Sequence, residues 1–114
     1  CHKTTRLMRE RLGWAPELIE TTFQSRFGPK EWLQPYTVER VAELAKAGKK
    51  HIAVMAPGFS SDCVETLEEI NEEIKEAFEE AGGERFDYIP CLNDDEAHID
   101  MIEAIVETEL AGWV

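Results

Sequence analysis

Basic residues are scarce in this sequence of 114 residues, in which 12 Lys and Arg stand against 24 Asp and Glu. The formal net charge is −12, which argues strongly against a nucleic-acid partner, because nucleic acids are bound through basic patches. An acidic chain can instead bind metal cations or basic partners, or can simply be kept in solution by its charge. The charge balance therefore excludes one class of partner without selecting another.

Long apolar runs and paired cysteines are also missing. No apolar stretch approaches the roughly 20 residues of a membrane-spanning helix, so we expect no integral membrane protein. The three cysteines, Cys1, Cys63 and Cys91, lie far apart and form no CxxC pair. This spacing indicates neither a zinc knuckle nor a disulfide framework, and a reducing cytoplasm is the simpler interpretation. Hydrophobic residues make up 43% and charged residues 32% of the chain, which is typical of one soluble globular domain.

The first residues read Cys-His-Lys, without an initiator Met, a signal peptide or a targeting pattern. Residues 4–13 already have the spacing of a helix, with Leu7, Met8 and Leu12 on one side. We therefore expect the sequence to begin inside a longer protein.

Helical and extended patterns alternate along the chain. Strands are predicted over residues 18–23, 51–56 and 86–89. Further helices are predicted over residues 37–47, 62–81 and 94–110. The run over residues 51–56 is nearly all apolar, as in strands covered on both faces. This alternation predicts an α/β fold with a parallel sheet flanked by helices in three layers, α/β/α.

Polar residues mark the expected helix starts. Thr37 is a plausible N-cap for the helix over residues 37–47, and Gly48 supplies its C-terminal stop. Asn93 is expected to cap the last helix, with Glu96 completing a capping box.

The expected ligand-binding edge follows from the topology, because ligands of open parallel sheets bind beyond the carboxyl ends of the strands. In this sequence those ends lead into three loops, residues 24–32, 57–65 and 91–94. Aromatic residues, among them Trp32 and Phe59, lie in the first two loops. They either pack down on the domain or line a ligand cleft, and the pattern does not distinguish the two.

The predicted helix over residues 62–81 is strongly acidic. Its glutamate stripe comprises Glu65, Glu69, Glu73, Glu76 and Glu80. A separate apolar face comprises Leu67, Ile70, Ile74, Ala77, Phe78 and Ala81. Like charges four residues apart destabilise a helix by roughly 0.2–0.5 kcal/mol per pair. Such a stripe needs solvent or a cation, and both interpretations stay open.

Other polar residues of this region have structural interpretations. Asp62 and Glu65 have the spacing of a capping box. His51 and His98 are expected to be structural or exposed rather than catalytic. Cys63 precedes the stripe, and a lone cysteine is more often a packing residue than a ligand.

Three stretches of the sequence, taken together, carry a family resemblance. They are FQSRFGPKEWL at residues 23–33 with PYT at 35–37, PGFSSDCVETLEE at residues 57–69, and YIPCLN at residues 88–93. In order and spacing they resemble ferrochelatase, and most closely its proteobacterial branch. The resemblance extends over essentially all of residues 1–114.

The resemblance implies a Rossmann-like chelatase half-domain. Residues 1–114 would be a partial C-terminal α/β domain of a two-domain enzyme with a porphyrin cleft between its halves. The family inserts Fe²⁺ into protoporphyrin IX, releasing two protons and giving protoheme, in the last step of heme biosynthesis. The family's catalytic His lies just upstream of the matched segment and is absent from this chain. We therefore expect the isolated chain to be inactive.

The resemblance also implies roles for residues of this chain. Glu65 matches the carboxylate that partners the catalytic His. Glu69 and Glu73 match the line of acidic metal ligands that begins at Glu65. The positions that match porphyrin-binding residues are Gln24, Ser25, Arg26, Trp32 and Phe59. Such residues suit the reaction, because metal insertion needs a base for the pyrrole N–H protons, and carboxylates bind Fe²⁺ without trapping it as thiolates would.

The expected partners are protoporphyrin IX, Fe²⁺ as substrate and the missing N-terminal half. No tightly bound cofactor is expected. Some relatives hold a [2Fe–2S] cluster through clustered C-terminal cysteines, which this sequence lacks. We expect a bacterial cytoplasmic location, and leave peripheral attachment to the inner membrane open. Self-association of the fragment is also open, because strands 18–23 and 51–56 would flank an absent strand and expose their edges.

Other interpretations remain. A free-standing acidic α/β module could bind a cation or a protein without catalysis. The smaller cobalt and sirohydrochlorin chelatases share the general fold, although they rely on paired histidines that this chain does not have. The choice between protoporphyrin and coproporphyrin is not settled by the sequence, although the branch favours protoporphyrin.

Overall fold

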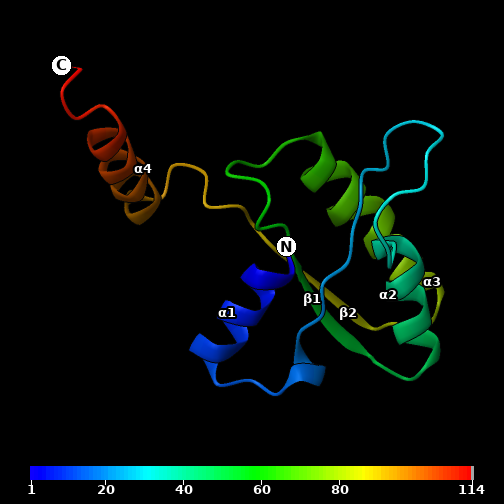
Figure 1. Cartoon of the computed structure of the whole chain (residues 1–114). Helices are drawn as coiled ribbons and strands as arrows, with labels where there is room; N and C mark the ends of the chain where they lie inside the picture. The colour runs from blue at the N-terminus through cyan, green and yellow to red at the C-terminus, as the bar shows by residue number, and fades with distance from the viewer. Residues whose placement is uncertain (114) are drawn as a thin grey trace.

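The computed structural model describes residues 1–113. Its elements, in chain order, are α1 (His2–Leu12), η1 (Pro16–Leu18), α2 (Thr37–Lys46), β1 (His51–Met55), η2 (Glu65–Ile74), α3 (Lys75–Glu80), β2 (Arg85–Ile89) and α4 (Glu96–Glu109). The π-helix η2 runs directly into α3, so the two form one continuous helical segment (Figure 1).

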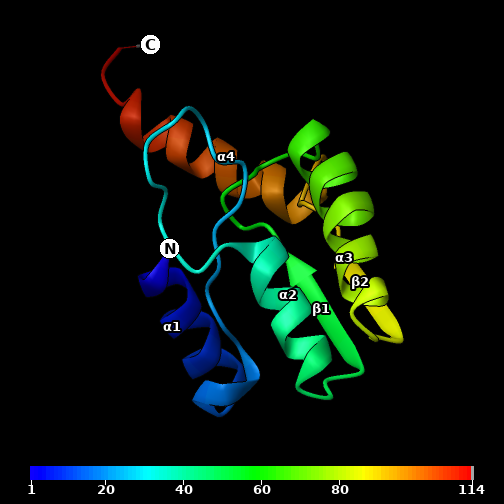
Figure 2. The ribbon, with the colours of Figure 1, turned by 90° about the vertical axis from the view of Figure 1, so that its right-hand side faces the viewer.

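The strands β1 and β2 form a parallel pair, in which His51 is aligned with Arg85 and Met55 with Ile89. Parallel strands cannot be joined by a tight turn, and the chain between them accordingly contains η2 and α3. Within residues 1–113 these two strands make up the whole sheet (Figure 2). The predicted α/β class and parallel sheet are therefore confirmed.

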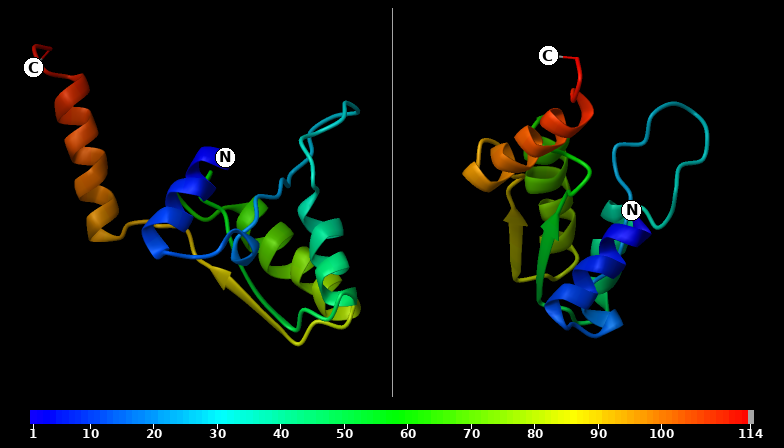
Figure 3. Two further views of the ribbon diagram at one scale, coloured as in Figure 1. Left: turned by 60° about the horizontal axis from the view of Figure 1, so that its bottom comes forward. Right: turned by 60° about the vertical axis from the view of Figure 1, so that its left-hand side comes forward.

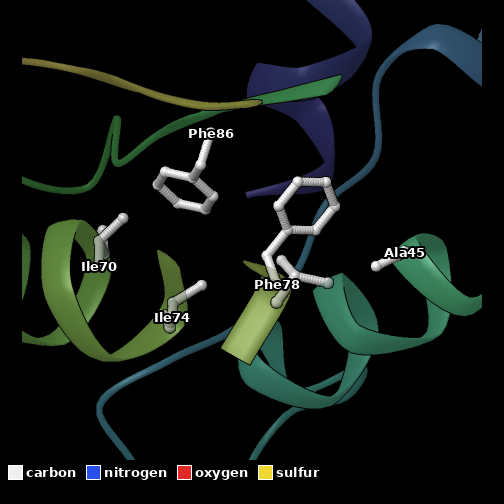
Figure 4. Packing of buried hydrophobic residues seen from close by; sticks show 6 residues of the cluster. Ala45, Ile70, Ile74, Phe78 and Phe86 are labelled. Atoms are coloured by element: carbon white, nitrogen blue, oxygen red, sulfur yellow. The ribbon is translucent and has the colours of Figure 1, made fainter. Parts of the chain in front are cut away.

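The hydrophobic core lies where α2 and the η2–α3 segment pack against one face of the sheet. It comprises Val41, Ala45, Ile70, Ile74, Phe78 and Phe86 (Figure 4). Phe78 is fully buried, and its ring centroid lies 6.2 Å from that of Phe86, at an interplanar angle of 54°. The core thus joins one strand to both helical segments.

The other face of the sheet is exposed, because Ala53, Met55 and Ile89 are all solvent-accessible. The described residues therefore form two packed layers, in contrast to the predicted three, and the strand over residues 51–55 is covered on one face only. The apolar side chains of this strand make its second face suitable for burial. That face is buried only where another part of the polypeptide packs on it.

Residues 18–23 do not form a strand, so this prediction was wrong. The 3₁₀-helix η1 takes up the start of the segment, and pairing is limited to an isolated parallel bridge between Phe23 and Tyr36. The backbone is extended at Ile19, as β-branched residues favour. A strand also needs a neighbouring strand along its length, and no local pattern can provide one.

The start of α2 differs from the prediction as well. Tyr36 is the N-cap, and Thr37 is the first helical residue rather than the cap. Thr37 is buried, and its hydroxyl donates to Thr22 Oγ1 at 2.9 Å. This side chain ties the helix to the segment before it instead of satisfying a helical N–H group.

The helix α4 leads away from the sheet and the core (Figure 3). Its N-cap is Asp95, whose side chain accepts a hydrogen bond from the Ala97 N–H, so the predicted capping box of Asn93 and Glu96 was wrong. Among the described residues of α4, His98 alone is buried. The helix α1 has no buried residue within its bounds. No helix in residues 1–113 is long and apolar enough to cross a membrane.

Candidate functional site

Two of the predicted porphyrin-binding residues lie against the acidic helix. The side-chain amide of Gln24 donates to the backbone oxygen of Glu65 at 2.9 Å. Ser25 donates to the carboxylate of Glu69 twice, from its backbone N–H at 2.6 Å and from its hydroxyl at 2.5 Å. The structure therefore brings together two segments that are more than 40 residues apart in the sequence.

The other predicted site residues are more loosely held. The guanidinium of Arg26 donates to the backbone oxygens of Pro29 and Lys30 at 3.0 and 3.2 Å, and so folds back on its own loop. Trp32 lies in the same exposed loop, with 39% of its surface accessible. Phe59 is half-buried in the turn after β1, and Glu73 is exposed on η2. Within residues 1–113, none of these side chains makes a hydrogen bond or an ion pair with the carboxylate of Glu65 or Glu69.

Glu65 is exposed in the first turn of η2. The pKa of its carboxyl is lowered, first by a hydrogen bond from the Cys63 side chain and then by one from its own backbone N–H. Glu65 is therefore a carboxylate at neutral pH, able to accept a hydrogen bond or a proton or to bind a cation. The capping-box interpretation was wrong, because the Asp62 N–H that the box requires donates instead to Asn93 Oδ1 at 2.8 Å.

A cluster of polar side chains around Asp62 fixes the loops at this edge of the sheet. The Asp62 carboxylate accepts hydrogen bonds from Tyr88 Oη at 2.5 Å, Thr66 Oγ1 at 2.8 Å and Asn93 Nδ2 at 2.8 Å. These bonds, that from Tyr88 above all, hold the pKa of Asp62 well below its usual range. Burial, and then the bond to Asp62, raises the pKa of Tyr88 above its ordinary value.

The cluster connects four parts of the chain: the turn after β1, the start of η2, the strand β2 and the loop before α4. Two of its members, Asp62 and Asn93, could be recognised from the sequence, but only as expected helix caps. Tyr88 and Thr66 were missed, because a tyrosine in a strand and a threonine in a helix have no local pattern that indicates a shared carboxylate.

The described part of the chain holds no preformed metal cluster. Within residues 1–113, no three His, Cys, Asp or Glu side chains are grouped closely enough to bind a metal ion. The three cysteines are free thiols. Glu69 and Glu73 lie four residues apart on η2, but the carboxylate of Glu69 already accepts two hydrogen bonds from Ser25. The metal-ligand roles of Glu65, Glu69 and Glu73 therefore stay predictions.

His98 has a structural setting at the edge of this site. Its Nε2 lies 2.9 Å from Ser60 Oγ, and its Nδ1 lies 2.7 Å from the backbone oxygen of Asn93. The side chain is buried, in line with the expectation that it is structural or exposed.

Comparison with known proteins connects this site to one family. The sequence model of the family described as Ferrochelatase matches residues 1–110. The chain is 67% identical to a ferrochelatase of Rhodobacter capsulatus, 60% identical to one of Allorhizobium ampelinum and 59% identical to one of Brucella ovis, over its whole length in each case. It spans about a third of the length of these curated relatives.

The match is continuous and includes every element from α1 to α4. It contains the segment with Gln24 and Ser25, the acidic helix, and the Asp62 cluster that joins them to the sheet. The resemblance expected from the three sequence stretches is therefore confirmed, and the chain belongs to the ferrochelatase family.

Proposed function

We propose that this chain is the C-terminal part of an enzyme that inserts Fe²⁺ into protoporphyrin IX to form protoheme. The observation that carries the proposal is the docking of Gln24 and Ser25 on the glutamate-bearing helix, together with the family membership of the whole chain. This docking puts a polar segment suited to the edge of a macrocycle next to carboxylates suited to a cation. The remaining two thirds of the polypeptide would supply the other wall of the cleft and the catalytic His.

In the proposed reaction, four Fe–N bonds form while two pyrrole N–H bonds break, and the two protons leave through bases of the enzyme. Glu65 would accept a proton or stabilise the protonated base, for which its ionised state at neutral pH is suited. Glu73, which is exposed on η2, would offer a hard oxygen ligand to the incoming Fe²⁺, whereas both carboxylate oxygens of Glu69 are already bound by Ser25. Trp32 and Phe59 would pack on the macrocycle as aromatic walls.

We test the proposal with Glu65→Gln in the full-length enzyme, meaning the ferrochelatase polypeptide that carries this chain. The substitution keeps the side-chain volume and removes the charge, so kcat should fall by about 100-fold or more, as for the loss of an acid–base group. The Tm should stay close to that of the wild type, because Glu65 is exposed and does not cap the helix.

Glu68→Gln is the matched control, since Glu68 is also exposed on η2 and lies outside the predicted metal line. Its kcat should match the wild type. A Glu65→Gln enzyme that keeps normal turnover but melts earlier would show that Glu65 is a structural residue. Iron insertion by the isolated chain would contradict the assignment of the base to the rest of the polypeptide.

A further inference from the structure

Ser25 has an unusual backbone conformation for a residue with a side chain. Its φ is 57°, in the left-handed region that residues other than Gly, Asn and Asp seldom adopt. A residue persists in that region only where its surroundings hold it there. A neighbouring group must therefore keep the Ser25 backbone in this conformation.

The carboxylate of Glu69 is that group. Its Oε1 accepts the Ser25 backbone N–H at 2.6 Å, and its Oε2 accepts the Ser25 hydroxyl at 2.5 Å. Both oxygens of one carboxylate thus bind one residue, through two short bonds of the charge-assisted kind. The contact is half-buried, and Gln24 adds a third bond by donating to the backbone oxygen of Glu65.

This arrangement distinguishes Glu69 from its neighbours on η2. Glu68, Glu72 and Glu73 are exposed, and none of them makes a side-chain hydrogen bond or ion pair within residues 1–113. Of this group of glutamates, Glu69 is the one whose carboxylate reaches across to another segment. A residue that served only to attract cations would not need two directed bonds to a strained serine.

We propose that Glu69 is a positioning residue for porphyrin binding: its carboxylate fixes Ser25 in the left-handed conformation and so holds residues 24–26 in place against η2. The inference rests on the proposed function, because it takes residues 24–26 as part of the porphyrin site. It assigns Glu69 to the placement of the macrocycle, whereas Glu73 keeps its proposed place in the metal path.

The test compares Glu69→Gln with Glu72→Gln in the full-length enzyme. Three readouts are used: hydrogen exchange of the backbone around residues 24–26 without ligand, the Kd for protoporphyrin IX from fluorescence quenching, and the separate KM values for porphyrin and Fe²⁺. Glutamine can accept one of the two bonds but lacks the charge, so exchange should become faster and the porphyrin Kd should rise about tenfold. The KM for Fe²⁺ should change less than twofold. Glu72→Gln should leave the exchange and the porphyrin Kd unchanged.

Two more variants examine the contact itself. Glu69→Asp keeps the charge but is one methylene shorter, so it cannot reach both donors and should also weaken porphyrin binding. Ser25→Gly keeps the N–H, loses the hydroxyl and adopts a positive φ without strain. Because Glu69 would act through Ser25, the effects of Glu69→Gln and Ser25→Gly on the porphyrin Kd should not add in the double variant.

An increase in the KM for Fe²⁺ with unchanged exchange and porphyrin Kd would overturn the proposal and make Glu69 a metal ligand. Additive effects of the two substitutions would overturn it as well. A wild-type enzyme that binds no porphyrin would refute the proposed function itself. Unchanged porphyrin affinity in Glu69→Gln, beside a wild type that binds porphyrin, would refute the positioning role alone.

Discussion

Gly83 should not tolerate alanine, because its missing side chain leaves room for the ring of Phe78. A Cβ built on Gly83 would lie 2.2 Å from Phe78 Cε1, 2.3 Å from Cδ1 and 2.5 Å from Cζ. Carbon atoms pack at about 3.5–4.0 Å, so the ring or the backbone would have to move by more than an ångström. Phe78 is fully buried and packs on Phe86, which leaves the ring no free direction.

The magnitude follows from the two ways in which the strain can be relieved. If the core absorbs the extra methyl group by small shifts, the cost of overpacking is about 1–3 kcal/mol. If the Phe78 ring is expelled, the loss approaches that of a buried Phe→Ala substitution, about 3–5 kcal/mol. We therefore expect Gly83→Ala to lower the free energy of unfolding by about 3 kcal/mol.

Urea unfolding of the full-length enzyme measures the effect, with Gly58→Ala as the matched control. No atom lies within 4 Å of a Cβ built on Gly58, and its φ is outside the left-handed region, so the control should unfold like the wild type. Adding Phe78→Leu to Gly83→Ala should cost less than the sum of the two single changes, because the smaller side chain relieves the clash. Equal unfolding midpoints for Gly83→Ala and Gly58→Ala would refute the reasoning.

Two further predictions concern the polar contacts at the sheet edge. Because folding lowers the pKa of Asp62, its contribution to stability is fully present above the unfolded value of about 3.9 and is lost as the pH falls toward the lower folded value. The stability difference between wild type and Asp62→Asn should therefore be constant above about pH 5 and shrink below about pH 4; urea midpoints measured across that range would contradict this if the difference stayed constant. His98→Ala should leave the core intact but speed hydrogen exchange in the first turns of α4, because the bonds to Ser60 and Asn93 are lost; unchanged exchange there would show that other contacts hold the helix.

Much of the fold could be predicted because its signals are local. The apolar run over residues 51–55 and the glycines after the helices place the strands and helices near their observed bounds. The strand predicted over residues 18–23 failed for the opposite reason, since pairing depends on a neighbour that no local pattern specifies. Thr37 was misplaced by one position, because a threonine before a helical run is equally compatible with the cap and with the first helical residue.

The site was predicted in its parts but not in its connections. The periodicity of an α-helix put Leu67 on the buried face of the acidic helix, whereas the π-helix buries Thr66, Ile70 and Ile74 and leaves Leu67 49% exposed. A π-helix has i→i+5 hydrogen bonds and therefore a different periodicity. The contact between Ser25 and Glu69 spans 44 positions, and nothing in either segment alone indicates it.

The way in which α4 is attached has a mechanical consequence. Its buried residue, His98, lies in the first turn, while Ile102 and Ile105 farther along the helix are exposed within the described chain. Within residues 1–113 the buried attachment of the helix is therefore confined to its first turn. From His98 to Glu109 the helix is about 16 Å long, so a rotation of about 10° about its first turn would move its C-terminal end by roughly 3 Å. Asn93 binds both the imidazole of His98 and the carboxylate of Asp62, so the first turn of α4 is tied through one residue to the turn before η2.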